Sequence, residues 1–175
     1  MIIKLIIFSI CTLGIIFISF YSAARFRTYG FLRFFAFESL LVLILYNAEH
    51  WFRNPFSIIQ IVSWLLLVAS IFIVSYGFYM LRKFGEPKEV IDDTEVLVTR
   101  GIYKYIRHPL YSSLILIAWG AFLKDISIVS FILILIASGL PVAMAKVEEK
   151  ENIQKFGEKY SSYMQNTKMF IPFII

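Results

Sequence analysis

Long apolar stretches, separated by short polar ones, dominate the pattern of this chain. Residues 5–24, 54–81 and 126–145 contain no Asp, Glu, Lys or Arg. At about 1.5 Å per residue, roughly 20 helical residues cross a hydrocarbon core of about 30 Å. Each of these stretches therefore predicts a membrane-spanning helix.

Two further apolar stretches are less regular. Residues 34–52 include two acidic residues, an Asn and a His, and residues 109–123 would form a helix of only about 22 Å. Lys124 and Asp125 alone join the second stretch to residues 126–145, and so short a connection predicts an antiparallel helical hairpin. We therefore expect five transmembrane helices, at about 3–24, 34–52, 55–81, 109–123 and 126–145.

Composition places the chain among membrane proteins. The 175 residues are 59% hydrophobic and 17% charged, whereas soluble domains are nearer half apolar and a quarter charged. This predicts an all-α integral membrane protein with a single domain over residues 1–175. No clear small-residue cleavage site precedes Arg25, so we expect the first stretch to be a retained span rather than a signal peptide.

The distribution of charge predicts an orientation. Most of the 17 Lys and Arg residues fall on one side of a five-span arrangement. Because cytoplasmic loops are enriched in these cations, we expect an outside N-terminus and cytoplasmic segments at 82–108 and 146–175. Residues 146–163 carry apolar side chains at roughly helical spacing, which predicts a cytoplasmic C-terminal helix continuing the last span.

Several function classes are not indicated. The formal charge of +5 does not point to nucleic acid, because the cations form no basic stripe with a reader motif. The one cysteine, Cys11, excludes a disulfide or a cysteine zinc set within the chain. No obligate protein partner is evident, and we expect contact with membrane lipid.

Ionisable side chains gather at the predicted cytoplasmic end of the hairpin. Pro109 suits the first turn of a helix, which puts His108 near the N-cap, where N–H groups and the helix dipole favour an anion. Glu148 and Glu149 follow the adjoining helix and favour a cation. A zwitterion would satisfy both poles, although each residue taken singly could be an interfacial anchor.

Glu38 is a second candidate, because a charged side chain inside a predicted span is costly. Two interpretations stay open for it. It forms a wall of a substrate pocket, or it is a structural partner of Arg33 or of another helix.

Four motifs resemble, in order and spacing, those of the isoprenylcysteine carboxyl methyltransferase family, which is itself similar to the phospholipid N-methyltransferases. They are Val98-Thr99-Arg100-Gly101-Ile102-Tyr103, Arg107-His108-Pro109-Leu110-Tyr111, Glu148-Glu149 and Phe156-Gly157-Glu158-Lys159-Tyr160. The resemblance covers the chain from about Glu95 to the C-terminus. It implies S-adenosylmethionine as methyl donor, a cytoplasmic donor pocket closed by the C-terminal segment, and a lipophilic substrate.

The resemblance also implies which residues bind the donor. The helix start with His108 would meet the methionyl carboxylate, and Glu148 would meet the ammonium. Because the sulfonium methyl group is already activated, we expect no metal. Carried over by motif, the donor-binding residues are Glu95, Val96, Leu97, Val98, Tyr103, His108, Pro109, Leu110, Tyr111 and Glu148.

The residues expected to bind the methyl acceptor depart from the family pattern. Many members have an Arg one helical turn before the Glu pair, whereas this chain has Met144. Arg107 or Arg100 would then hold a substrate carboxylate, and Glu149 or Glu38 would deprotonate an amine or thiol acceptor.

The resemblance implies carboxyl O-methylation of a prenylated cysteine or an analogue. The alternatives are phospholipid N-methylation, small-thiol S-methylation and an NADPH-dependent activity like that of membrane sterol reductases, some of which share an Arg-His-Pro-x-Tyr-like element. The predicted catalytic residues are Arg107, Glu149 and Glu38.

Overall fold

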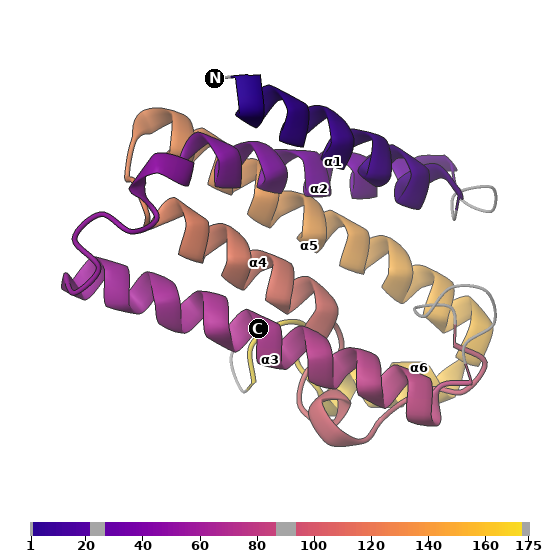
Figure 1. The fold of residues 1–175 in the computed structure, drawn as a ribbon. Coiled ribbons are helices and arrows are strands. Elements are labelled where there is room, and N and C mark those ends of the chain that lie inside the picture. The colour runs from indigo at the N-terminus through magenta and orange to yellow at the C-terminus, as the bar shows by residue number, and fades with distance from the viewer. Residues whose placement is uncertain (1, 22–26, 87–93, 173–175) are drawn as a thin grey trace. The chain divides into compact units, whose positions relative to one another are not determined.

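The computed structural model describes residues 2–21, 27–86 and 94–172, and within these ranges it contains helices and isolated β-bridge residues but no strand. The predicted all-α class is confirmed. Figure 1 labels the α-helices, and two short 3-10 helices, η2 (Ala48–His50) and η3 (Gly101–Lys104), lie between them. The α-helices are α1 (Ile2–Tyr21), α2 (Arg27–Tyr46), α3 (Ile58–Phe84), α4 (Pro109–Phe122), α5 (Ile128–Phe156) and α6 (Glu158–Asn166).

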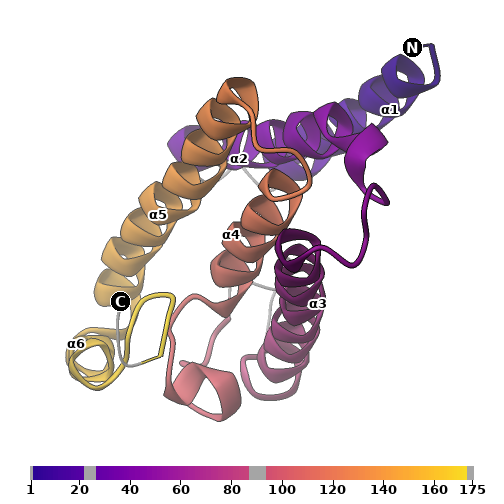
Figure 2. The same cartoon turned by 90° about the vertical axis from the view of Figure 1, so that its left-hand side faces the viewer.

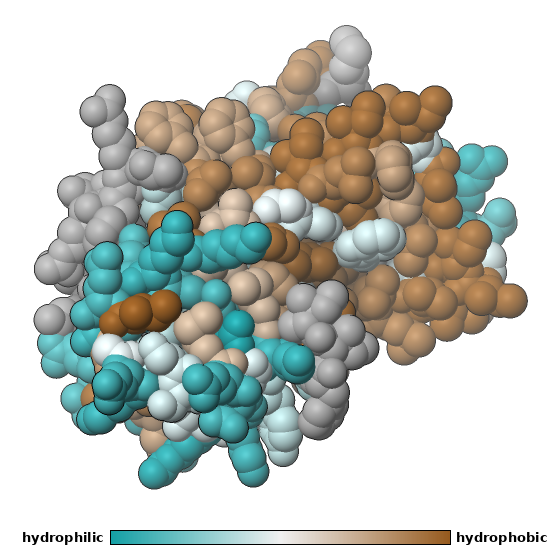
Figure 3. All heavy atoms as spheres, turned by 180° about the vertical axis from the view of Figure 1, so that it is seen from behind, coloured by the Kyte–Doolittle hydropathy of each residue, from teal (hydrophilic) through white to brown (hydrophobic). Residues whose placement is uncertain are grey.

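Four of these helices, α1, α2, α3 and α5, are long and apolar enough to cross a membrane, and α4 is a shorter apolar helix of 14 residues. Their large apolar side chains are widely exposed, and such side chains form broad brown areas in Figure 3. A surface of this kind suits contact with lipid rather than water. These are the features of an all-α integral membrane protein; the number of crossings and the side on which each terminus lies stay predictions.

Several helix boundaries differ from the predicted spans. Helix α2 begins at Arg27, before the predicted span at 34–52, and α3 runs over Ile58–Phe84 rather than 55–81. Helix α2 ends at Tyr46, whereas the predicted span runs over 34–52, because Asn47 turns its side chain to another helix and η2 follows. Helix α5 continues to Phe156, as expected for a helix over residues 146–163 that continues the last span, but Gly157 interrupts this helix before α6 begins at Glu158. Residues 22–24 of the predicted first span lie outside the described residues.

The chain divides into two compact units, and the first comprises residues 1–68 and 114–144. In this unit α1 and α2 run side by side (Figure 1). Side chains from α2, α4 and α5 form its core, where Ala118 and Ala121 allow close packing. The buried members of this core are Leu40, Leu43, Ala118, Ala121, Phe122, Ile134 and Ala137.

Polar side chains in the first unit satisfy one another between helices. Asn47 is fully buried; its Nδ2 donates to the Ala121 carbonyl oxygen at 2.8 Å, and its Oδ1 accepts from the Ser130 hydroxyl at 3.0 Å. Lys124 is also buried, donates to Gln60 Oε1 at 3.1 Å and lies over the Trp64 ring, with its Nζ 3.7 Å from the centroid. Such pairing offsets the cost of polar groups in an apolar environment.

The second unit comprises residues 69–113 and 145–175. Met80, Leu81, Val98 and Tyr103 form its buried apolar cluster. The chain turns sharply at Gly157, whose φ of +59° is open to glycine at little cost. Figure 2 shows α6 end-on, next to the last turns of α5.

Replacing Asn47 by Leu should lower the free energy of unfolding by about 1 kcal/mol, because the Ala121 carbonyl and the Ser130 hydroxyl each lose one of their hydrogen bonds. Titration of the purified protein with a denaturing detergent measures the change. The control is Gln154→Leu, at an exposed position of α5. An Asn47→Leu variant as stable as the wild type would contradict the structural role of this side chain.

Candidate functional site

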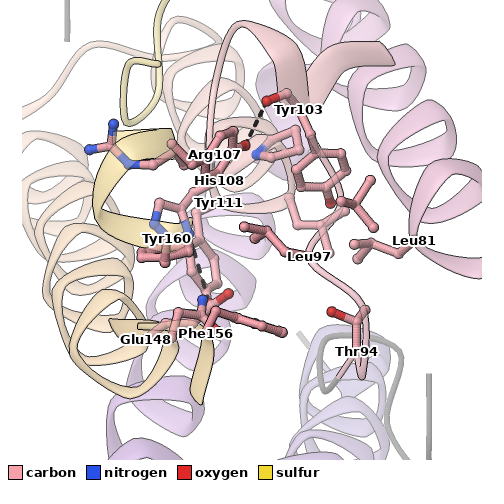
Figure 4. A pocket seen from close by; sticks show the side chains of 15 residues that line it. Leu81, Thr94, Leu97, Tyr103, Arg107, His108, Tyr111, Glu148, Phe156 and Tyr160 are labelled. Carbon is pink, nitrogen blue, oxygen red and sulfur yellow. Dashed lines mark hydrogen bonds and ion pairs between the residues drawn. The ribbon is translucent and has the colours of Figure 1, made fainter. Parts of the chain in front are cut away.

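A pocket opens within the second unit, between the end of α3, the segment 94–111, the end of α5 and α6. The space not filled by protein atoms is about 620 Å³, and this volume includes open solvent at the mouth of the pocket. Figure 4 shows the labelled side chains around it. The lining residues are Leu81, Thr94, Leu97, Val98, Tyr103, Arg107, His108, Pro109, Leu110, Tyr111, Glu148, Asn152, Phe156, Tyr160 and Tyr163.

The start of α4 forms one side of the pocket. Pro109 is the first helical residue, and the His108 carbonyl accepts the Ser112 N–H at 2.9 Å, which places His108 at the N-cap. The His108 side chain is 2% exposed and stacks on the Tyr111 ring at a centroid separation of 5.5 Å. The positive end of the helix dipole lies here and favours an anionic group.

Glu148 supplies a negative charge to the same pocket. Its Oε2 accepts the Tyr111 hydroxyl at 2.8 Å and lies 3.8 Å from His108 Nδ1. The side chain is 26% exposed, so a bound cation could reach it without full burial of the carboxylate. A positive pole and a negative pole therefore lie in one pocket, as the sequence suggested for a zwitterion.

Glu149 and Arg107 form a buried pair next to the pocket. Arg107 Nε donates to Glu149 Oε1 at 2.7 Å, and the two side chains are 9% and 10% exposed. The same carboxylate oxygen lies 3.4 Å from His108 Nε2. In Figure 4 the Arg107 guanidinium points away from Leu81 and Leu97, while the stem of the side chain lines the pocket.

Gly101 shapes the turn that leads into this site. Its φ is +60°, and a Cβ atom there would lie 2.6 Å from Met80 Cε and 2.9 Å from the Tyr76 hydroxyl. A side chain at this position is therefore both strained and crowded. The glycine lets η3 pack on α3, which buries Tyr103.

The structure places most of the predicted donor-binding residues around this pocket. Glu95 and Val96 differ, because both are exposed and lie outside its lining. The predicted residues that line it are Leu97, Val98, Tyr103, His108, Pro109, Leu110, Tyr111 and Glu148. Their role in binding a donor stays a prediction.

The predicted catalytic residues have different surroundings. Arg107 and Glu149 contact each other beside the pocket. Glu38 belongs to the first unit, where its Oε1 accepts the Thr12 hydroxyl at 2.8 Å. Met144, at the position where the family resemblance suggests an Arg, is almost fully buried in that unit. Catalytic roles for these residues also stay predictions.

Several lining residues were not assigned from the sequence. Asn152 and Phe156 follow Glu148 at four-residue intervals on α5, so helical spacing could have found them. Tyr160 belongs to a motif that was recognised but not assigned to the pocket. Leu81 and Tyr163 carry no sequence signal, because only tertiary packing brings them here.

Two tyrosines of α6 have perturbed ionisation. Burial raises the pKa of Tyr160 to about 12; a hydrogen bond with Asn152 opposes this rise, and the charges of Glu148 and Glu149 add to it. Burial likewise raises the pKa of Tyr163, whose hydroxyl donates to the Tyr103 carbonyl oxygen at 2.6 Å. Both rings are therefore neutral walls of the pocket at physiological pH.

Comparison with known proteins gives one family and several relatives. The sequence profile of the family described as phospholipid methyltransferase matches residues 58–159, which is more than half of the chain. A probable protein-S-isoprenylcysteine O-methyltransferase from Oryza sativa subsp. indica is 27% identical over 133 residues. That alignment covers 72% of this chain and 64% of the relative.

Two methanethiol S-methyltransferases are also similar to this chain. The protein from Crocosphaera subtropica is 28% identical over 117 residues, and the one from Pseudomonas deceptionensis is 25% identical over 114 residues. These alignments cover 64% and 63% of this chain but 44% and 42% of the relatives. The chain thus spans less than half the length of these two relatives.

The raised pKa of Tyr160 predicts a loss of stability in alkali. Because the folded-state pKa exceeds the unfolded-state value near 10, the contribution is fully present below pH 10 and is lost as the pH rises through 12. The expected loss is about 1.4 kcal/mol at pH 11. Thermal unfolding of the wild type and of Tyr160→Phe between about pH 8 and pH 11 measures it. The variant should show the shallower decline, and parallel curves would contradict the assignment.

Proposed function

The chain belongs to the phospholipid methyltransferase family, and from this we propose that it transfers a methyl group from S-adenosylmethionine to a lipophilic acceptor in the membrane. The observation that carries the proposal is the pairing of Glu148 with the start of α4 in one pocket. A carboxylate and a helix N-terminus within one site suit a ligand that carries both an ammonium and a carboxylate.

The residues of the pocket fit this donor. The methionyl part of S-adenosylmethionine carries an ammonium and a carboxylate, and the proposal assigns them to Glu148 and to the helix start at His108. The aromatic side chains of Tyr103 and Phe156 offer apolar surface for an adenine ring. When bound, the donor supplies a methyl group that its sulfonium has already activated.

The protein's own contribution would be positioning and exclusion of water. The hydrogen bond from Tyr111 fixes the Glu148 carboxylate, and the neutral rings of Tyr160 and Tyr163 close the wall on the side of α6. A transfer that consumes opposite charges gains from a site with little water. Holding both reactants in line supplies a further large part of the acceleration.

The first candidate acceptor is the carboxylate of a prenylated cysteine or an analogue. The similarity to the rice protein, which covers 72% of this chain, supports this choice. A carboxylate is anionic at neutral pH and needs no general base. The apolar character of the helices suits a substrate that arrives through the lipid.

The second candidate is a small thiol, and the surroundings of Arg107 and Met144 favour it. Arg107 is engaged by Glu149, and Met144 is a buried apolar residue. The guanidinium beside the pocket is thus turned to protein groups rather than to an acceptor. A thiol needs no cation to hold it, although it must lose a proton before attack.

Calorimetric titration of the detergent-purified protein with S-adenosylhomocysteine and with NADPH tests the donor. We expect binding of the first, and a ten- to hundredfold weaker affinity in Glu148→Gln, since a hydrogen bond to a charged group is worth about 1.5–3 kcal/mol. Glu158→Gln, at an exposed position of α6, is the matched control. Binding of NADPH alone would overturn the proposal in favour of a reductase.

A transfer assay with radiolabelled donor separates the acceptors. N-acetyl-S-farnesylcysteine and a short alkanethiol are offered in parallel to the protein in lipid nanodiscs. We expect label on the farnesylcysteine carboxyl group, released by alkali as a methyl ester is. Label on the thiol alone would select the second candidate, and label on the nanodisc phospholipid alone would exclude both.

A further inference from the structure

The C-terminal end of α6 contacts the side chain of Arg107, which lies two residues before the first residue of α4. The last carbonyl groups of a helix have no intrahelical donor. Arg107 Nη1 donates to the carbonyl oxygen of Met164 at 3.2 Å and also to that of Thr167, which is the C-cap residue. A guanidinium at this place also meets the negative end of the helix dipole. Arg107 therefore caps α6.

Glu149 fixes the guanidinium in this position. Glu149 Oε1 accepts a hydrogen bond from Arg107 Nε at 2.7 Å, while Nη1 of the same guanidinium binds the end of α6. The planar guanidinium has donors in a rigid fork, so one side chain reaches α5 and α6 at the same time. Both partners are about nine-tenths buried, where water competes little for these bonds.

Backbone pairing continues the contact beyond α6. The Lys168 N–H donates to the Tyr105 carbonyl at 3.0 Å, and the Arg107 N–H donates to the Lys168 carbonyl at 2.8 Å. The His108 N–H donates to the Met169 carbonyl at 3.1 Å, and the Ser112 hydroxyl donates to the Phe170 carbonyl at 2.9 Å. The segment after α6 thus lies directly along the N-cap of α4.

The contacts of Arg107 and of the segment after α6 position the wall of the pocket that α6 forms. Tyr160 and Tyr163 line it from α6, so their positions depend on how α6 is held. We propose that Arg107 is a positioning residue that holds residues 158–170 against the pocket, and that it acts on the donor through Tyr160 and Tyr163 rather than by touching a substrate carboxylate. The part of this inference that concerns ligand binding rests on the proposed function.

The test uses Arg107→Lys in the full-length protein. A lysine keeps the charge opposite Glu149, but its single ammonium group does not reproduce the fork that reaches α5 and α6 together. We expect amide hydrogen exchange in residues 158–170 of the unliganded variant to accelerate at least tenfold. The Kd for S-adenosylhomocysteine should rise at least tenfold, while the KM for the acceptor at saturating donor changes less than twofold.

Two further variants make the result decisive. Glu149→Gln keeps a hydrogen-bond acceptor for Arg107 but removes the negative charge of residue 149, so amide exchange in residues 158–170 should accelerate in this variant too. If Arg107→Lys also loses protection from exchange in α2, that variant is unfolded as a whole, and Glu149→Gln is used in its place. Arg82→Lys, at an exposed position of α3, should match the wild type.

Unchanged exchange in residues 158–170 of a folded variant would overturn the proposal. A rise in acceptor KM alone would overturn it too, because that result assigns Arg107 to the substrate. If the wild type binds no S-adenosylhomocysteine, the proposed function fails, and the exchange measurement, which needs no ligand, still decides whether Arg107 holds this segment.

Discussion

The ion pair between Glu149 and Arg107 is the interaction on which the candidate site depends. One carboxylate oxygen receives Arg107 Nε and lies 3.4 Å from His108 Nε2, so it joins the start of α4 to α5. The other end of the same guanidinium reaches the last turn of α6. Two buried charges are costly unless both are well paired, and here each charge offsets part of the cost of burying the other.

In the first unit, uncharged amide side chains and one lysine follow the same rule. Asn47 uses its amide oxygen and its amide nitrogen on different helices, and Gln60 exchanges hydrogen bonds with Lys124 through its side chain and the Lys124 carbonyl. Polar groups among apolar helices have no water to turn to, so their partners must come from the protein. This explains why these side chains interrupt stretches that are otherwise suited to lipid.

The sequence predicted the helical class and much of the pocket, because apolar length and motif spacing are local properties. Pro109 begins α4, where a first-turn proline is expected. The end of α2 was not predicted, since it depends on the hydrogen bond from Asn47 to a residue far along the chain. The partners of Arg107 and the place of Tyr163 were missed for the same reason: both depend on the direction that α6 takes after Gly157.

The break at Gly157 makes the site depend on the number of residues between Glu148 and Gly157. Glu148 and Phe156 lie on the same face of α5 before this break, and Tyr160 lies just beyond it. Each residue added to a helix rotates the remainder of the chain by roughly 100° about the helix axis. A single insertion between Glu148 and Gly157 would therefore send α6 to another side of α5 and separate the carboxylate from its aromatic wall. The number of residues in this interval is as much a part of the site as their identity.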